Sequence, residues 1–230
     1  GRVRLLGFDA EKQREVSIQV LEEGETFGAY DLLGSLSYPY RAIAASSGQV
    51  ARISLNQLLP WLERLPKWSE ILGQQAQHRQ CLIFFKTLTK LRTLNGVSLN
   101  QLLPYIVETR IEAGESLVSS SQAGHCWLRS GQMGTPEGTE ANSSAPFPSI
   151  GDSWGYPMPV PTDWIAQTDV LLYQLPQEHW QAACAIAPVL ANSTDSPDQE
   201  NSQSAKNGDG KSPSAQGLVN KTHTPSPHPN

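Results

Sequence analysis

The sequence predicts a mainly β protein with flanking helices, in which two related units of short strands follow one another before a disordered tail. Three observations lead to this prediction. A glycine-framed motif occurs twice, apolar and polar residues alternate in several short segments, and the composition changes abruptly near Asn192. Of the 230 residues, 38% are hydrophobic and 17% are charged, so most of the chain can build a core.

The repeat is the strongest of these signals. Gly24-Glu25-Thr26-Phe27-Gly28 occurs again, 127 residues later, as Gly151-Asp152-Ser153-Trp154-Gly155. The small apolar segment Ile43-Ala44-Ala45-Ser46 likewise has a counterpart in Ile165-Ala166-Gln167-Thr168, and Gly1 corresponds to Gly131. In both units we expect a strand next and then a helix, beginning at Ser54 in the first and at Pro176 in the second. A spacing of this kind indicates two copies of one structural unit.

Strands and helices are predicted from apolar periodicity. Val16–Val20 alternates with apolar residues on one face, and Val170–Leu175 is a short apolar run, so both read as strands. Ile71–Leu94 carries apolar residues at helical spacing and reads as a helical connector with an apolar face. Two similar heptapeptides begin at Ser54 and Ser98, 44 residues apart. They predict two helices with serine at the N-cap, although a helical solenoid is an alternative.

These signals divide the chain into four parts. Residues 1–68 form the end of a first unit, residues 69–94 the helical connector, residues 95–190 a second unit, and residues 191–230 a tail. The tail is rich in Ser, Asn, Asp, Gly and Pro, so we expect it to be disordered. Residues 134–149 have a similar composition and are expected to form a flexible loop. Because the chain opens with Gly1 inside a predicted strand, we expect the first unit to be truncated at its start.

Charge and cysteine content narrow the classes of function. The chain has 22 acidic and 17 basic residues, so its net charge is −5. The basic residues form no cluster of the kind that would predict nucleic-acid binding. Cys81, Cys126 and Cys184 lie far apart and fit a reducing compartment, so we expect a cytoplasmic protein. No apolar run is long enough to predict insertion into a membrane. His125 beside Cys126 is interpreted as packing, and no motif predicts a metal, a cofactor or an enzyme.

The order of elements, with a late Gly-acid-x-aromatic-Gly turn, resembles the cyclic-nucleotide-binding domain family. The residues that carry the resemblance are Phe27-Gly28-Ala29, the segment Tyr30-Asp31-Leu32-Leu33-Gly34, and Arg41-Ala42-Ile43-Ala44. The resemblance implies two β-rolls and, in the first, a phosphate-binding cassette at Phe27, Gly28, Arg41 and Ala42. Gly28 would let backbone N–H groups approach a cyclic phosphate, and Arg41 would neutralise it. Ala29 stands where the family has a glutamate for the ribose, and the segment before Arg41 is about three residues longer than expected.

The second copy departs further from the family. It has Trp154-Gly155-Tyr156-Pro157 in place of the Phe-Gly-Glu turn and no arginine nearby, so we expect it to bind no nucleotide. Residues 151–157, 161–169 and 175–184 also resemble the regulatory region of cyanobacterial peptidase-containing ABC exporters. That resemblance implies a transporter, or another protein domain, as the partner.

Two functions follow as alternatives. The first is a regulatory or sensory module that binds a cyclic nucleotide or another small anionic ligand and controls an attached or partner protein such as an ABC exporter. The alternative is a degenerate scaffold that binds no nucleotide and mediates protein–protein assembly. A transcription regulator would need a helix-turn-helix after the roll, where this chain has the tail instead.

Overall fold

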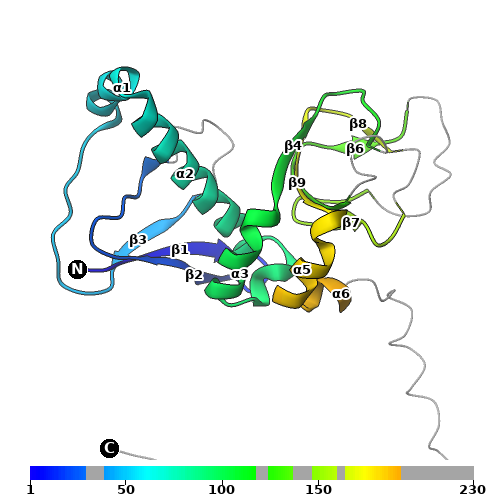
Figure 1. The fold of residues 1–230 in the computed structure, drawn as a ribbon, viewed down its shortest axis with the longest axis horizontal. Helices are drawn as coiled ribbons and strands as arrows, with labels where there is room; N and C mark the ends of the chain where they lie inside the picture. Colours follow the sequence, from blue (N-terminus) through cyan, green and yellow to red (C-terminus); the bar gives the residue numbers. More distant parts are fainter. Residues whose placement is uncertain (30–38, 118–123, 137–146, 160–163, 193–230) are drawn as a thin grey trace, which may run out of the picture. The chain divides into compact units, whose positions relative to one another are not determined.

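The computed structural model describes residues 1–29, 39–117, 124–136, 147–159 and 164–192. These residues form β-sheets with flanking helices, which confirms the predicted fold class at that level (Figure 1). The predicted loop at 134–149 lies mostly outside the described residues, and so does the tail beyond Asn192. Among the residues that the structure describes, no helix is both long enough and apolar enough to cross a membrane.

The first sheet has three antiparallel strands in the order β2-β1-β3. They are β1 (Val3–Asp9), β2 (Arg14–Leu21) and β3 (Arg41–Ala44). The predicted strand Val16–Val20 lies within β2, but its apolar residues do not share one face. The pairing shifts between Leu5 and Leu6, which leaves Ile18 as an extra residue on β2. This β-bulge reverses the alternation, so Leu21 is buried and Val20 is exposed.

Helices α1 (Leu55–Arg64) and α2 (Pro66–Thr87) follow the first sheet. The N–H and the hydroxyl of Ser54 both donate to Oε1 of Gln57, so the predicted N-cap at Ser54 is confirmed. Pro66 begins α2, at a position where a missing N–H breaks no helical bond. The predicted connector is therefore helical, although its start at residue 69 falls inside α2 and Leu88–Leu94 lies beyond it.

The second predicted N-cap is wrong. Helix α3 spans Gly96–Leu102, and its cap is Asn95, whose side chain accepts a hydrogen bond of 2.8 Å from the N–H of Ser98. Ser98 is thus the third residue of the helix. Asn95 lies three residues earlier and accepts from the N–H of Ser98, so the helix has already begun before the serine.

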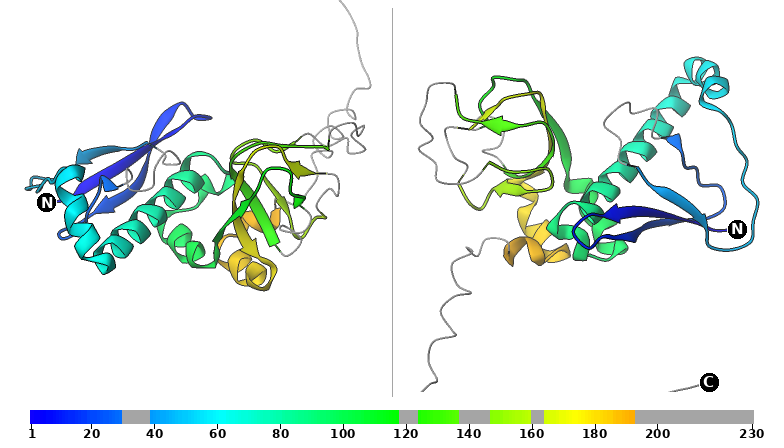
Figure 2. Two further views of the ribbon diagram at one scale, coloured as in Figure 1. Left: turned by 90° about the horizontal axis from the view of Figure 1, so that it is seen from above. Right: turned by 180° about the vertical axis from the view of Figure 1, so that it is seen from behind.

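A larger group of strands follows α3 and a 3₁₀ turn, η3 (Leu103–Tyr105). Its main sheet has the order β4-β9-β5-β7, and a smaller sheet pairs β6 with β8. The strands are β4 (Val107–Ile111), β5 (Gly124–Ser130), β6 (Met133–Gly134), β7 (Ser153–Gly155), β8 (Ile165–Ala166) and β9 (Val170–Pro176). The chain then forms η4 (Gln177–His179), α5 (Trp180–Ile186) and α6 (Val189–Asn192). The strand predicted at Val170–Leu175 is confirmed, and the strands curl around a common interior (Figure 2).

Two apolar clusters hold these elements together. The first joins the first sheet to α2 and to one face of β5 and β9, where Phe85 packs edge-on against Trp127 with ring centroids 5.1 Å apart. The second fills the interior of the second group of strands. Its buried members are Ile111, Leu117, Cys126, Leu128, Met133, Trp164, Ala166, Val170 and Leu172. Burial of each large side chain stabilises the fold by roughly 1.5–3 kcal/mol, so these clusters dominate the local energetics.

The two copies of the repeat share strand register. Val3 pairs with Ala44 in the first sheet, and Met133 pairs with Ala166 in the smaller sheet. The hydrogen bonds beside them correspond as well: the N–H of Arg2 donates to Ser46 Oγ at 2.9 Å, and the N–H of Gln132 donates to Thr168 Oγ1 at 3.0 Å. The correspondences predicted from the sequence therefore hold at the level of individual bonds.

One predicted strand is wrong. Residues 48–53, which the structure describes, form no strand and are exposed, although their counterparts in the second copy begin β9. β9 is paired on both sides, with β4 and with β5. No described strand of the first copy offers residues 48–53 such partners, so their N–H and C=O groups face solvent.

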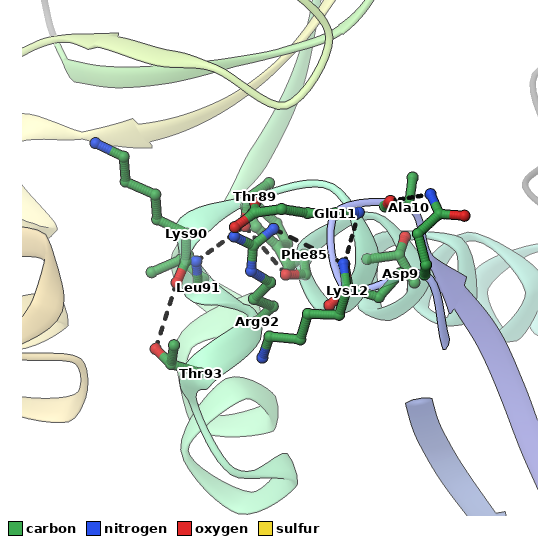
Figure 3. A network of polar contacts seen from close by, with 12 residues as sticks. Asp9, Ala10, Glu11, Lys12, Phe85, Thr89, Lys90, Leu91, Arg92 and Thr93 are labelled. Atoms are coloured by element: carbon green, nitrogen blue, oxygen red, sulfur yellow. Dashed lines mark hydrogen bonds and ion pairs between the residues drawn. The ribbon is translucent and has the colours of Figure 1, made fainter. Parts of the chain in front are cut away.

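An ionic contact ties the β1–β2 hairpin to η2 (Lys90–Thr93), the turn that follows α2 (Figure 3). Oδ1 of Asp9 accepts hydrogen bonds of 3.1 Å from the N–H groups of Glu11 and Lys12. Arg92 forms ion pairs with Asp9 and Glu11. The hairpin tip is thus fixed to the segment that leads into α3.

Candidate functional site

The turn that opens the candidate site is built the same way in both copies. The N–H of Glu25 donates to the carbonyl of Glu22, and Oε2 of Glu25 accepts a 2.7 Å hydrogen bond from the N–H of Glu22. In the second copy, the N–H of Asp152 donates to the carbonyl of Ser149, whose N–H in turn donates to Oδ2 of Asp152 at 2.8 Å. The third residue of each turn is a glycine with positive φ, 84° at Gly24 and 95° at Gly151. A turn of this type requires such a residue there.

Phe27 and Gly28, two of the predicted ligand-binding residues, follow this turn directly. Phe27 is partly buried against the cluster that includes α2. Gly28 has a φ of 90°, and its N–H donates to the hydroxyl of Tyr40 over 2.6 Å. The N–H that the sequence assigned to a phosphate therefore already has a partner. Ala29 follows with a partly buried side chain, and residues 30–38 lie outside the described residues.

Arg41 and Ala42 occupy the start of β3, on opposite faces of the sheet. Arg41 pairs with Leu6 and Ala42 with Leu5, and only Leu5 is buried against the helices. The side chain of Arg41 is 63% exposed and forms an ion pair with Glu15 on the outer face. Tyr40, the partner of Gly28, packs against the cluster on the helix side. The structure thus places Gly28 and Arg41 near the two ends of one segment, with their polar groups bound to different partners.

This arrangement defines what the cassette can do chemically. To clasp an anion, Arg41 would have to exchange one carboxylate partner, Glu15, for another anionic group. Loss of the pair with Glu15 costs little free energy, because an exposed ion pair stabilises a protein by only about 0–1 kcal/mol. Ala29 offers no hydrogen-bond acceptor to a ribose. The predicted ligand role of Phe27, Gly28, Arg41 and Ala42 stays a prediction.

In the second copy, aromatic rings and backbone contacts occupy the corresponding position. Trp154, the counterpart of Phe27, packs with Trp164 at a centroid distance of 6.1 Å. A Cβ on Gly155 would lie 2.5 Å from the carbonyl oxygen of Gly124, so only glycine fits there. The N–H of Tyr156 donates to that same carbonyl. The turn is therefore packed against β5.

His125 and Cys126 behave as packing residues, as the sequence analysis interpreted them. The ring of His125 lies 4.7 Å from that of Trp127 and 5.3 Å from that of Trp180, and its Nδ1 donates to the carbonyl of Tyr156. Burial lowers the pKa of His125 to about 4, and it raises the pKa of Cys126 to about 12. Within the described ranges, no group of three or more His, Cys, Asp or Glu side chains could hold a metal ion.

The sequence analysis missed a polar pocket between β2, the Glu22–Glu25 turn and α2. It has a volume of about 430 Å³, and the residues that line it are Gln19, Glu25, Thr26, Ile71, Gln74, Gln75, His78 and Arg79. Arg79 is only 6% exposed. One signal could have revealed it: Arg79 lies three residues before the buried Leu82, on the apolar side of the predicted connector helix.

Comparisons with known proteins give a distant likeness. No family model matches the chain, and no curated protein does. Among solved structures, cAMP-bound PfPKA-R is 14% identical over 84% of this chain and 67% of that chain, with a TM-score of 0.39. The regulatory domain of Toxoplasma gondii PKA with cAMP is 12% identical over 84% and 74%, with a TM-score of 0.39.

A third neighbour is the regulatory subunit of a cAMP-independent protein kinase A from Trypanosoma brucei. It is 13% identical over 87% of this chain and 72% of that chain, with a TM-score of 0.39. At these values, the likeness assigns neither a family nor a function.

Proposed function

We propose that the chain is a regulatory, non-catalytic module built from two copies of a cyclic-nucleotide-binding-like β-roll. The single observation that carries the proposal is a hydrogen bond that occurs in both copies: the N–H of Arg2 donates to Ser46 in the first, and the N–H of Gln132 donates to Thr168 in the second. It is accompanied by the same strand register, and two glycine-framed turns repeat the same geometry. Matching hydrogen bonds at matching sequence positions are the mark of a duplicated unit.

In this proposal, the first copy takes the ligand. Gly28, with its positive φ, and Arg41 lie at the two ends of the cassette, and Arg41 exchanges Glu15 for a cyclic phosphate or another small anion. The lack of an acceptor at Ala29 weakens the contact with a ribose. The second copy takes no nucleotide, because Trp154 and Trp164 pack together there.

The second copy and the helices pass the ligand's effect to a partner. Residues of helix α2 share one apolar cluster with the first sheet and with Trp127 and Tyr173. A ligand that binds one arrangement of α2 better than another shifts the population between them. On the sequence resemblance, we propose that the partner is an ABC exporter and that the module works in the cytoplasm.

A scaffold without a nucleotide is the second candidate, and two observations favour it. Arg41 is already paired with Glu15. The outer face of the first sheet exposes apolar side chains, with Phe8 55%, Val20 39% and Ile43 37% exposed. Exposed apolar side chains on one face of a sheet favour protein–protein contact.

Calorimetric titration of cyclic AMP and cyclic GMP into the 230-residue chain distinguishes the two candidates. We expect micromolar to millimolar binding that weakens at least tenfold in Arg41→Ala and is unchanged in Arg64→Ala, an exposed arginine of α1. In Glu15→Gln, which releases Arg41 from its ion pair, binding should tighten. Absence of heat at millimolar nucleotide, from a chain whose circular dichroism shows it folded, would refute the sensor and leave the scaffold.

A further inference from the structure

The pocket beside the Glu22–Glu25 turn contains a buried positive charge with few partners. Nη2 of Arg79 donates to the carbonyl of Thr26 at 2.8 Å, and Nε donates to Oε1 of Gln19 at 3.4 Å. A guanidinium carries five N–H donors, so three of them have no such bond. No carboxylate among the described residues forms an ion pair with Arg79. Because Arg79 is 6% exposed, its charge is largely removed from water, and Glu25, the carboxylate that lines the pocket, forms no ion pair with it.

A second donor lines the same pocket. The hydroxyl of Thr26 donates to Oε1 of Gln75 over 2.9 Å, which fixes the orientation of that amide. The Nε2 group of Gln75 is then left with two N–H donors. One charged and one neutral donor group in a pocket of about 430 Å³ match the oxygens of an anion.

The rest of the lining limits the kind of molecule that fits. Gln74 lines the pocket and donates to Glu70, and His78 is bonded to Asn100 at 3.0 Å. The carboxylate of Glu25 is held by the N–H of Glu22. Only Ile71 is apolar. A ligand with a polar, anionic group is therefore favoured, since the lining side chains offer hydrogen-bond donors to it.

We infer that this pocket is a binding site for a small oxyanion, a carboxylate or a phosphate group, with Arg79 as its principal contact and Gln75 as its second. The site is separate from the cassette, because neither Gly28 nor Arg41 lines it. Its walls come from the first sheet and from α2, so an occupant joins these two elements. The inference does not depend on the proposed nucleotide site.

The test is a titration of sodium phosphate and, separately, sodium acetate into the ¹⁵N-labelled 230-residue chain, followed by NMR at constant ionic strength with sodium chloride as the reference. We expect saturable shifts of the Arg79 Nε–H and the Thr26 amide, with a dissociation constant in the millimolar range or below. The salt that binds more tightly identifies the group as phosphate or carboxylate. In Arg79→Gln, the affinity should fall at least tenfold.

Three controls make the test decisive. Arg64→Gln removes an exposed guanidinium group of α1 and should change the affinity less than twofold. Gln75→Ala keeps the charge of Arg79 and should weaken binding severalfold, which covers the case that Arg79→Gln does not fold. Shifts that fail to saturate, or that persist unchanged in folded Arg79→Gln or in Gln75→Ala, would overturn the site. Loss of binding in Arg41→Gln would instead assign the anion to the cassette.

Discussion

Nη1 of Arg92 lies 3.9 Å from Oδ1 of Asp9, a carboxylate whose side chain is only 1% exposed. The contact joins the end of β1 to η2, two elements that are far apart in the sequence (Figure 3). The same oxygen also accepts the N–H groups of Glu11 and Lys12 that turn the hairpin. One buried carboxylate therefore shapes the hairpin and fixes it to the segment that follows α2.

Replacement of Asp9 by alanine should destabilise the protein by about 2 kcal/mol, because it removes three interactions of a buried acceptor at once. Equilibrium unfolding in urea, followed by circular dichroism, measures the loss. Glu11→Gln is the matched control. It removes only an ion pair whose carboxylate is 67% exposed, so the loss should stay below about 1 kcal/mol. Equal losses for both variants would contradict a special role for Asp9.

The two glycine turns should respond differently to alanine. At Gly24, an added Cβ meets nothing within 4 Å, so only the backbone strain of a φ of 84° is incurred, about 1–2 kcal/mol. At Gly151, the Cβ would lie 2.1 Å from the carbonyl oxygen of Leu88, the residue that caps α2. We therefore expect Gly151→Ala to cost several kcal/mol, of the order seen for overpacked sites.

Urea unfolding of both variants checks the difference. A larger loss in Gly151→Ala would establish that the second turn packs tightly against the end of α2, while the first is set only by its own geometry. Similar losses in the two variants would mean that the turn at Gly151 can move away from Leu88 without a loss of stability.

The parts of the fold that the sequence predicts correctly are those fixed by local patterns. The strand at Val16–Val20, the cap at Ser54 and the turns at the repeated glycines each depend on a few residues, and the structure confirms all three, although the apolar face predicted for the strand is wrong. The bulge at Ile18 and the cap at Asn95 were missed because each depends on a competition between neighbouring residues. Residues 48–53 carry a strand pattern without strand partners, and a strand needs partners.

For the candidate site, the sequence proposes residues but does not predict their geometry. Phe27, Gly28 and Arg41 were located by resemblance to a motif, and a motif states which residues occur without stating what they contact. The partners Tyr40 and Glu15 come from pairing between β1, β2 and β3, which brings distant residues together. Arg79 belongs to no motif. The one sequence feature that points to it is the position of a charged residue on the apolar side of a predicted helix.

His125 should make the stability depend on pH. Burial lowers its folded-state pKa to about 4, while the unfolded chain has an ordinary value of 6.5. Between these values the unfolded state binds more protons, so stability is full above about pH 6.5 and falls as the pH drops toward 4. The loss over this window should be about 3 kcal/mol. Urea midpoints at pH 7, 5.5 and 4.5 measure it.

His125→Gln isolates that contribution, since glutamine can donate to the carbonyl of Tyr156 and does not titrate. Its stability should change less than that of the native chain between pH 7 and 4.5. The control His78→Gln replaces an exposed histidine and should keep the native slope. A native slope in His125→Gln would assign the pH dependence to other groups.

The three thiols should differ in reactivity. Burial raises the pKa of Cys81 and Cys126 to about 12, although a hydrogen bond with Tyr173 opposes the shift at Cys81. The pKa of Cys184, on the short helix α5, is also raised by burial; Cys184 and Cys81 are both partly exposed, whereas Cys126 is buried. Since the thiolate is the reactive form, Cys184 should react with a disulfide reagent at pH 8 faster than the other two. Spectrophotometric titration should count one fast thiol in the folded chain and three in 6 M guanidinium, and Cys184→Ser should abolish the fast phase. A fast phase that survives in Cys184→Ser would mean that the partly exposed Cys81 reacts directly, or that Cys126 is reached by local opening of its apolar cluster.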